Sequence, residues 1–96
     1  MSTRKLNNIS ISEFESFLEL CQCKFIKNDN GHVKYSRSDL FRPIIFQNHI
    51  SPIPEFIILN NLRTLGISKK NFFEILDSKT EVKKVNNSTY KLIPLK

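Results

Sequence analysis

A run of turn-forming residues at positions 28–31 (Asn-Asp-Asn-Gly) constrains the fold of this chain more than any other stretch. Such a cluster, with Asn-Gly at its end, is typical of a tight connection between two antiparallel strands. Residues 23–27 before it have a strand-like composition, and residues 31–37 after it alternate Val33 and Tyr35 with polar side chains. We therefore expect a β-hairpin here.

A third strand is predicted at residues 43–47, where Pro43 stands near the beginning and its missing N–H is tolerated. The register follows if Arg37 faces Arg42 across the intervening turn. A slip by one residue would turn every side chain to the other face of the sheet. The facing pairs on the core side are then Val33 with Phe46 and Tyr35 with Ile44. On the same register His32 faces Gln47, and His32, Lys34 and His49 share the face opposite the core.

The first helix is predicted near residue 10, because Ser10 and Glu13 have the spacing of a capping box. Ser12 and Glu15 offer the same box two residues later. Further helices are indicated at both ends of the Leu-Gly-Ile-Ser segment of residues 65–68. The order of elements is therefore α-β-β-β-α, followed by a short third helix.

The second helix is predicted to begin near Pro54 and to end at Gly66, a residue that suits the end of a helix. Ser68 is placed to cap the short third helix. Residues 82–93 alternate loosely around two asparagines, so both a hairpin and a loose tail remain open.

The composition is that of a single folded domain with a basic surface. Apolar residues make up 40% of the chain, and 15 Lys and Arg against 9 Asp and Glu give a net charge of +6. The excess lies in residues 23–48 and from residue 68 onward, which favours nucleic acid or an acidic protein as partner. No apolar run approaches the roughly 20 residues of a membrane span, and no signal-peptide pattern opens the chain. We expect a cytoplasmic protein without a membrane partner.

Cys21 and Cys23 have no further cysteine to pair with. A disulfide framework needs more cysteines, and zinc needs about four ligands at suitable spacing. We interpret them as buried or half-buried thiols in a reducing compartment, and we expect neither a metal nor a cofactor.

The chemistry of the chain is concentrated at His32. Histidine can take and give a proton near neutral pH, since its unperturbed pKa is about 6.5. Lys34 stands two residues on and would share its face of a strand. A proton-transfer group beside a fixed positive charge suits phosphodiester cleavage.

Three short motifs occur in an order that resembles the HicA family of bacterial toxins. They are Gly-His-Val-Lys-Tyr at residues 31–35, Ile-Ile-Phe-Gln-Asn-His at 44–49 and Leu-Gly-Ile-Ser at 65–68. The chain departs from the family in three places. Asn-Gly replaces Gly-Ser before His32, Val33 replaces the second histidine of a common pair, and two prolines follow His49.

The resemblance implies a domain over residues 1–78 with a fold like the double-stranded RNA-binding domain. In this α+β fold a three-stranded antiparallel sheet carries its helices on one face, and residues 79–96 would form a C-terminal extension. The family members are mRNA interferases, which implies a toxin that cleaves mRNA without metal and is neutralised by a HicB-type antitoxin. His32 corresponds to the catalytic histidine.

Other residues would support this chemistry. His49 is a candidate second acid or base, and Lys34 a candidate for holding the scissile phosphate. The remaining cations of the predicted strands could follow the RNA backbone, although they cannot all share one face. They are Lys24, Lys27, Arg37 and Arg42. Two alternatives remain: a non-catalytic RNA-binding module of the same fold, and a domain that binds acidic proteins.

Overall fold

The first helix begins where the Ser10 capping box predicts. In the computed structural model, which describes residues 5–95, a short 3₁₀-helix, η1 (Leu6–Asn8), precedes helix α1 (Ile11–Leu20). Ser10 Oγ accepts a hydrogen bond from the Glu13 N–H at 3.1 Å, and the Glu13 carboxylate accepts one from the Ser10 N–H at 3.0 Å. Two otherwise unpaired N–H groups are thereby satisfied, and the box that starts at Ser12 is not used.

The predicted sheet is confirmed. Strands β1 (Lys24–Asp29), β2 (His32–Ser36) and β3 (Ile44–Gln47) form an antiparallel sheet in the order β1-β2-β3. β1 begins one residue later than predicted and continues to the turn, where Asn30 and Gly31 both have positive φ (55° and 88°). Positive φ at both central residues is the geometry that Asn-Gly favours in a two-residue hairpin turn.

The register of β2 on β3 is also the predicted one. Val33 pairs with Phe46, Tyr35 with Ile44 and His32 with Gln47. The four residues predicted for the core face are all buried.

The two later helices end and begin at the predicted residues. Helix α2 (Glu55–Leu65) stops at Gly66, whose φ of 71° lies in the left-handed region that favours glycine. Helix α3 (Lys69–Leu76) is capped by Ser68, whose Oγ accepts a hydrogen bond from the Asn71 N–H at 3.1 Å. Within residues 5–95 no helix has the length and apolarity needed to cross a membrane.

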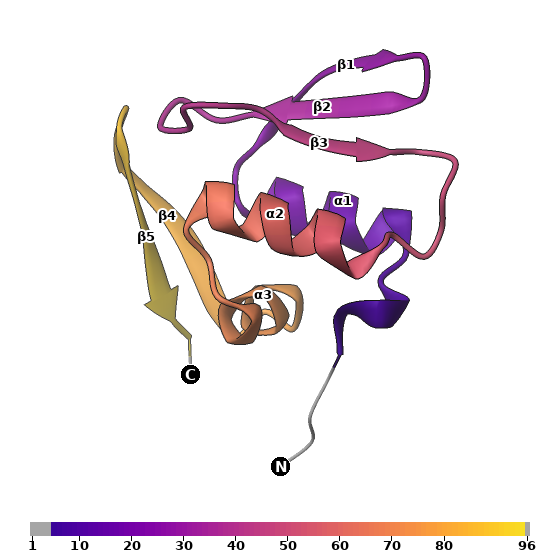
Figure 1. Ribbon diagram of the computed structural model, residues 1–96. Coiled ribbons are helices and arrows are strands. Elements are labelled where there is room, and N and C mark those ends of the chain that lie inside the picture. The colour runs from indigo at the N-terminus through magenta and orange to yellow at the C-terminus, as the bar shows by residue number, and fades with distance from the viewer. Residues whose placement is uncertain (1–4, 96) are drawn as a thin grey trace.

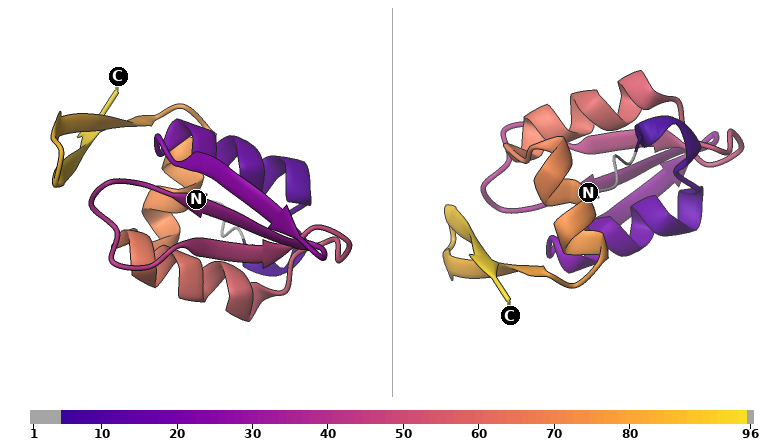
Figure 2. Two further views of the ribbon diagram at one scale, coloured as in Figure 1. Left: turned by 90° about the horizontal axis from the view of Figure 1, so that it is seen from above. Right: turned by 90° about the horizontal axis from the view of Figure 1, so that it is seen from below.

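The helices cover one face of the three-stranded sheet, with α1 and α2 side by side beneath it and α3 below them (Figures 1 and 2). Phenylalanine rings join these layers. Phe14 of α1 meets Phe46 of β3 edge to face at 5.3 Å between centroids, and Phe17 meets Phe72 of α3 at 4.6 Å. The protein is thus a small α+β domain whose opposite sheet face is left free.

The C-terminal residues form a hairpin and not a loose tail, the other possibility that the sequence left open. Strands β4 (Thr80–Asn86) and β5 (Thr89–Pro94) make a second, two-stranded sheet beside the body of the domain (Figure 1). The hairpin is attached by hydrogen bonds across long sequence distances. The Gln22 side-chain amide donates to the Val82 carbonyl at 2.7 Å, and Ser38 Oγ donates to the Asn87 carbonyl at 2.6 Å.

Candidate nucleic-acid interface

His32 lies at the first position of β2 on the free face of the sheet, with its side chain exposed. Its Nε2 lies 3.3 Å from the amide nitrogen of Gln47, the residue that it faces on β3. Among residues 5–95 this is the only hydrogen bond of the ring. The imidazole is therefore accessible, and one of its nitrogens is free to exchange a proton with a bound molecule.

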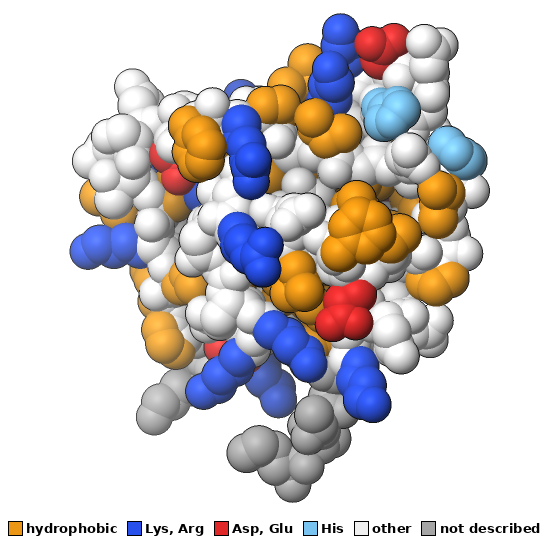
Figure 3. Space-filling model, in the orientation of Figure 1, with side chains coloured by type: hydrophobic (Ala, Val, Ile, Leu, Met, Phe, Trp, Pro, Cys, Tyr) orange, Lys and Arg blue, Asp and Glu red, His pale blue; other side chains and the backbone are white. Residues whose placement is uncertain are grey.

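His49 lies at the same end of the sheet, in the turn after β3, and is exposed. Its ring rests against the backbone of Gly31: a Cβ placed on Gly31 would come within 3.1 Å of His49 Nδ1. The Asn48 N–H donates to the Gly31 carbonyl at 2.9 Å and holds the turn there. In Figure 3 the two histidines of the chain are neighbours at one edge of the surface.

Lys34 occupies the middle of the free face and is half-buried. Across the strands it faces Lys27 of β1, and like charges placed directly opposite each other disfavour the free protein. Lys27 approaches Asp29 at 4.0 Å, whereas Lys34 has no ion pair among residues 5–95. A bound anion between the two strands would relieve this repulsion.

Arg37 does not belong to this surface, and its prediction as an RNA contact needs correction. Its side chain is buried, with the residue only 7% exposed. Its Nε and one terminal nitrogen donate to the two oxygens of Asp39 at 2.6 and 2.9 Å, and the other terminal nitrogen donates to the Cys21 carbonyl at 2.9 Å. The guanidinium also lies 4.0 Å from the centroid of the Tyr90 ring. Arg37 therefore contributes to the fold through these contacts, although its side chain also lines a pocket that is open to solvent.

The other predicted cations are exposed but lie in different places. Lys24 faces Ser36 at the end of the free face, and Lys27 lies along β1 beside Lys34. Arg42 stands before β3, where its Nε donates to Thr64 Oγ1 of α2 at 2.8 Å. The lysines therefore form one group on the free face, which we call the lysine face: Lys24, Lys27 and Lys34. Arg42 lies apart from it.

An apolar groove that the sequence did not reveal lies next to His32. It has a volume of about 270 Å³ and runs between β3 and the beginning of α2, with His32 and Gln47 at its rim. Phe56, Ile45 and Ile50 line it although they are 64%, 39% and 39% exposed. In Figure 3 hydrophobic side chains gather beside the histidines in this region. The only sequence signal for it is the phenylalanine on the side of α2 that faces away from the core.

The cysteines are free and buried, as predicted. Burial raises the pKa of the Cys23 thiol to about 11 and raises that of Cys21 further still. Since the thiolate is the reactive form, neither is suited to nucleophilic chemistry. In the part of the chain that the structure describes, no three His, Cys, Asp or Glu side chains lie together as metal ligands would.

Comparison of the chain with protein-family models, with curated proteins and with solved structures finds no match. The resemblance to the HicA family therefore rests on the three short motifs and their spacing alone.

Proposed function

We propose that this protein is a HicA-like toxin, a metal-independent endoribonuclease that cleaves mRNA. The observation that carries the proposal is the position of His32. It is an accessible imidazole on the free face of a sheet, with a lysine two residues on along the same face. The α1-β1-β2-β3-α2 order adds support, because it is the order expected of a domain like the double-stranded RNA-binding domain.

In the proposed reaction the 2′-oxygen of a ribose attacks the adjacent phosphorus as the bond to the 5′-oxygen breaks. The products are a 2′,3′-cyclic phosphate and a free 5′-hydroxyl. One group must take the proton of the 2′-hydroxyl and another must give a proton to the leaving oxygen. His32 performs one of these transfers, and His49, at the same end of the sheet, is the candidate for the other. Lys34 stabilises the charge that develops on the phosphate.

The test is cleavage of a structured mRNA fragment in EDTA, across a salt series. We expect cleavage to persist in EDTA and to weaken as salt rises, because phosphate contacts release counterions. His32→Ala should lower the cleavage rate by about 10²- to 10⁴-fold, the usual contribution of an acid or base group. Its stability should change by less than about 0.5 kcal/mol, as for other surface substitutions. Lys91→Ala, at an exposed position on the C-terminal hairpin, is the control.

Four results would contradict the proposal. Full cleavage by a folded His32→Ala variant would remove the histidine from the mechanism. Activity that is lost in EDTA and returns with Mg²⁺ would replace the mechanism with a metal-dependent one. RNA binding without cleavage would instead identify a non-catalytic RNA-binding module, and neither activity would favour a domain that binds acidic proteins.

The same end of the molecule offers a surface for a HicB-type antitoxin. The apolar groove beside His32 is the kind of exposed patch that marks a protein interface, and the lysines nearby would meet carboxylates of the partner. An antitoxin seated there would cover His32 and block RNA from it.

This proposal is tested with the product of the neighbouring reading frame, expected to be a small acidic protein. Phe56→Ala should weaken its binding by at least about 2 kcal/mol, as truncation of a central aromatic anchor does. Phe41→Ala is the matched control, because Phe41 is 84% exposed and lies outside the groove. A complex that leaves His32 and Lys34 open to solvent would contradict blocking at this face.

A further inference from the structure

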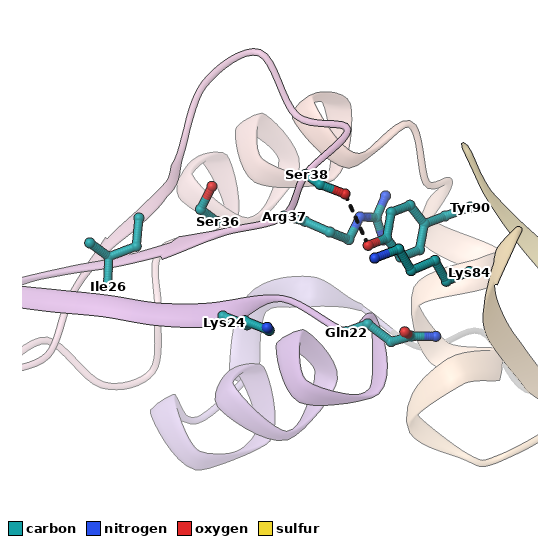
Figure 4. A pocket seen from close by; sticks show the side chains of 8 residues that line it. All are labelled: Gln22, Lys24, Ile26, Ser36, Arg37, Ser38, Lys84 and Tyr90. Atoms are coloured by element: carbon teal, nitrogen blue, oxygen red, sulfur yellow. Dashed lines mark hydrogen bonds between the residues drawn. The ribbon is translucent and has the colours of Figure 1, made fainter. Parts of the chain in front are cut away.

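A second pocket lies where the C-terminal hairpin meets the ends of β1 and β2, and we call it the hairpin pocket (Figure 4). Its volume is about 250 Å³, it is open to solvent, and Lys24 of the lysine face lines it. Residues from the two sheets and from the segments before β1 and after β2 line it. They are Gln22, Lys24, Ile26, Ser36, Arg37, Ser38, Lys84 and Tyr90.

The charge of the hairpin pocket is positive. Lys24 enters from β1 and Lys84 from β4, so that two ammonium groups approach from opposite sides (Figure 4). Neither lysine has an ion pair among residues 5–95. No carboxylate lines the pocket, and the nearby Asp39 uses both oxygens to accept hydrogen bonds from Arg37. The two lysine charges are therefore uncompensated.

Hydrogen bonds hold the hairpin in place beside the pocket. Ser38 Oγ donates to the Asn87 carbonyl and lies 3.3 Å from the Tyr90 hydroxyl, so these groups fix the hairpin against the body of the domain. Ser36 also lines the pocket and is half-buried, but its hydroxyl points away from the two ammonium groups (Figure 4). The two ammonium groups are thus the charged donors left for a ligand, and both suit the oxygens of a phosphate.

The hairpin pocket and His32 lie at opposite ends of strand β2. His32, Lys34 and Ser36 alternate along β2, so their side chains share the free face. Ser36 is four residue steps along the strand from His32, which is about 13 Å at the usual rise per residue. An RNA strand that follows β2 from His32 would pass Lys34 and reach the pocket within a few nucleotides.

We propose that the hairpin pocket binds a backbone phosphate of the RNA strand, a few nucleotides from the bond that is cut at His32. This inference rests on the proposed function for its substrate. It gives the C-terminal hairpin, which lies outside the family resemblance, a role in holding the substrate. Contacts of this kind position a strand without reading its sequence.

The experiment measures binding of two single-stranded RNA oligonucleotides to the full chain by fluorescence anisotropy, over a salt series. A short oligonucleotide spans only His32 and Lys34, and a longer one also reaches the hairpin pocket. The wild-type protein should bind the longer RNA more tightly and with a steeper salt dependence. Lys84→Ala should abolish this gain and reduce the log–log salt slope by about 0.7, the value for one phosphate contact on a single strand.

The matched control is Lys83→Ala, because Lys83 neighbours Lys84 on β4 but does not line the pocket. It should bind both oligonucleotides as the wild type does. Equal gains in the Lys84→Ala and wild-type proteins would overturn the inference. A second result would also overturn it: inorganic pyrophosphate binds in a Lys84-dependent way, but the longer RNA binds no more tightly than the short one. The pocket would then bind a free anion and not the RNA backbone.

These measurements distinguish failure of the ribonuclease proposal from failure of the hairpin-pocket inference. If the wild-type protein cleaves no RNA but keeps the length gain that depends on Lys84, the cleavage proposal fails and the hairpin pocket stands as an RNA contact. If cleavage depends on His32 but the gain is independent of Lys84, the pocket inference fails alone.

Discussion

The two ends of strand β2 each carry a basic side chain, and the protein uses them in opposite ways. At the first end, His32 is exposed, and its one hydrogen bond within residues 5–95 is to Gln47, at 3.3 Å. Just beyond the other end, Arg37 is buried and donates three hydrogen bonds of 2.6 to 2.9 Å. The imidazole of His32 is left for a partner, whereas the guanidinium of Arg37 is bonded inside the fold.

The difference shows that positive charge in a sequence does not by itself locate a binding surface. Arg37 and Lys34 lie three residues apart in the same basic segment, yet only Lys34 is left without an acidic partner among residues 5–95. What distinguishes them is whether the donors are already satisfied, because an unpaired cation at a surface can still gain from an anion. Substitutions at the two ends of β2 should therefore have different effects on stability and on RNA cleavage.

The largest effect is expected from Arg37→Ala. The change leaves the Asp39 carboxylate and the Cys21 carbonyl without their partner in a site that is largely buried. Removal of one partner of a buried ion pair costs about 3–5 kcal/mol, so unfolding by urea should show a loss of this size. Lys34→Ala is the control and should alter the free energy of unfolding by less than about 0.5 kcal/mol. If both variants lose a similarly small free energy of unfolding, the contacts of Arg37 with Asp39 and Cys21 contribute little to stability.

A smaller effect is expected at the His32 end from Gly31→Ala. At a φ of 88° a side chain costs about 1–2 kcal/mol, and here the new Cβ would also press on His49 Nδ1 from 3.1 Å. Gly66→Ala is the matched control, because its φ is 71° but nothing lies within 4 Å of the added Cβ. Both variants should be less stable than the wild type in urea unfolding.

The two glycine variants should differ in RNA cleavage. If His49 takes part in proton transfer, Gly31→Ala should slow cleavage because its Cβ displaces the ring, whereas Gly66→Ala should not. Equal cleavage by the two folded variants would remove His49 from the mechanism and leave His32 without this partner.

Much of the fold could be predicted because its signals are local. The Asn-Gly turn fixed where β1 and β2 meet, and the capping box at Ser10 and the glycine at position 66 marked two helix ends. Alternation along β2 then predicted which side chains face the core, and the predicted register of β2 on β3 was confirmed. The turn and the helix ends depend on residues within a few positions of one another, and the register of β2 on β3 follows from the short turn between these strands.

What could not be predicted depends on distant residues. The burial of Arg37 needs the Cys21 carbonyl and the ring of Tyr90, 16 and 53 positions away, so the charge pattern alone misplaced it. One part of this site was local: Asp39 follows Arg37 by two residues in the sequence, and it accepts two of the hydrogen bonds of Arg37. The hairpin pocket likewise forms only when β4 packs near Gln22, across 60 residues. A periodic pattern contains no such information.

The smallest effect concerns the thiols beside Arg37 and appears only at alkaline pH. Burial is the main cause that raises the pKa of Cys21 and Cys23, while the Arg37 charge opposes it. A raised native pKa means that the folded protein keeps protons that the unfolded chain releases. The stabilisation is therefore complete below pH 9, the ordinary thiol range, and is lost as pH rises through about 11 for Cys23.

The measurement compares urea unfolding of the wild type with that of a Cys21→Ala/Cys23→Ala variant from pH 7 to pH 10.5. Above pH 9 the free energy of unfolding should fall faster for the wild type than for the variant. The difference in free energy of unfolding between the two proteins should therefore narrow. Burial also raises the pKa of Tyr35, but Tyr35 is present in both proteins and largely cancels from the difference. If the difference stays constant or widens with pH, the thiols are not kept protonated by burial. The tightly packed end of β2 would then be more open to water than its hydrogen bonds indicate, and the contrast with the His32 end would be weaker than we infer.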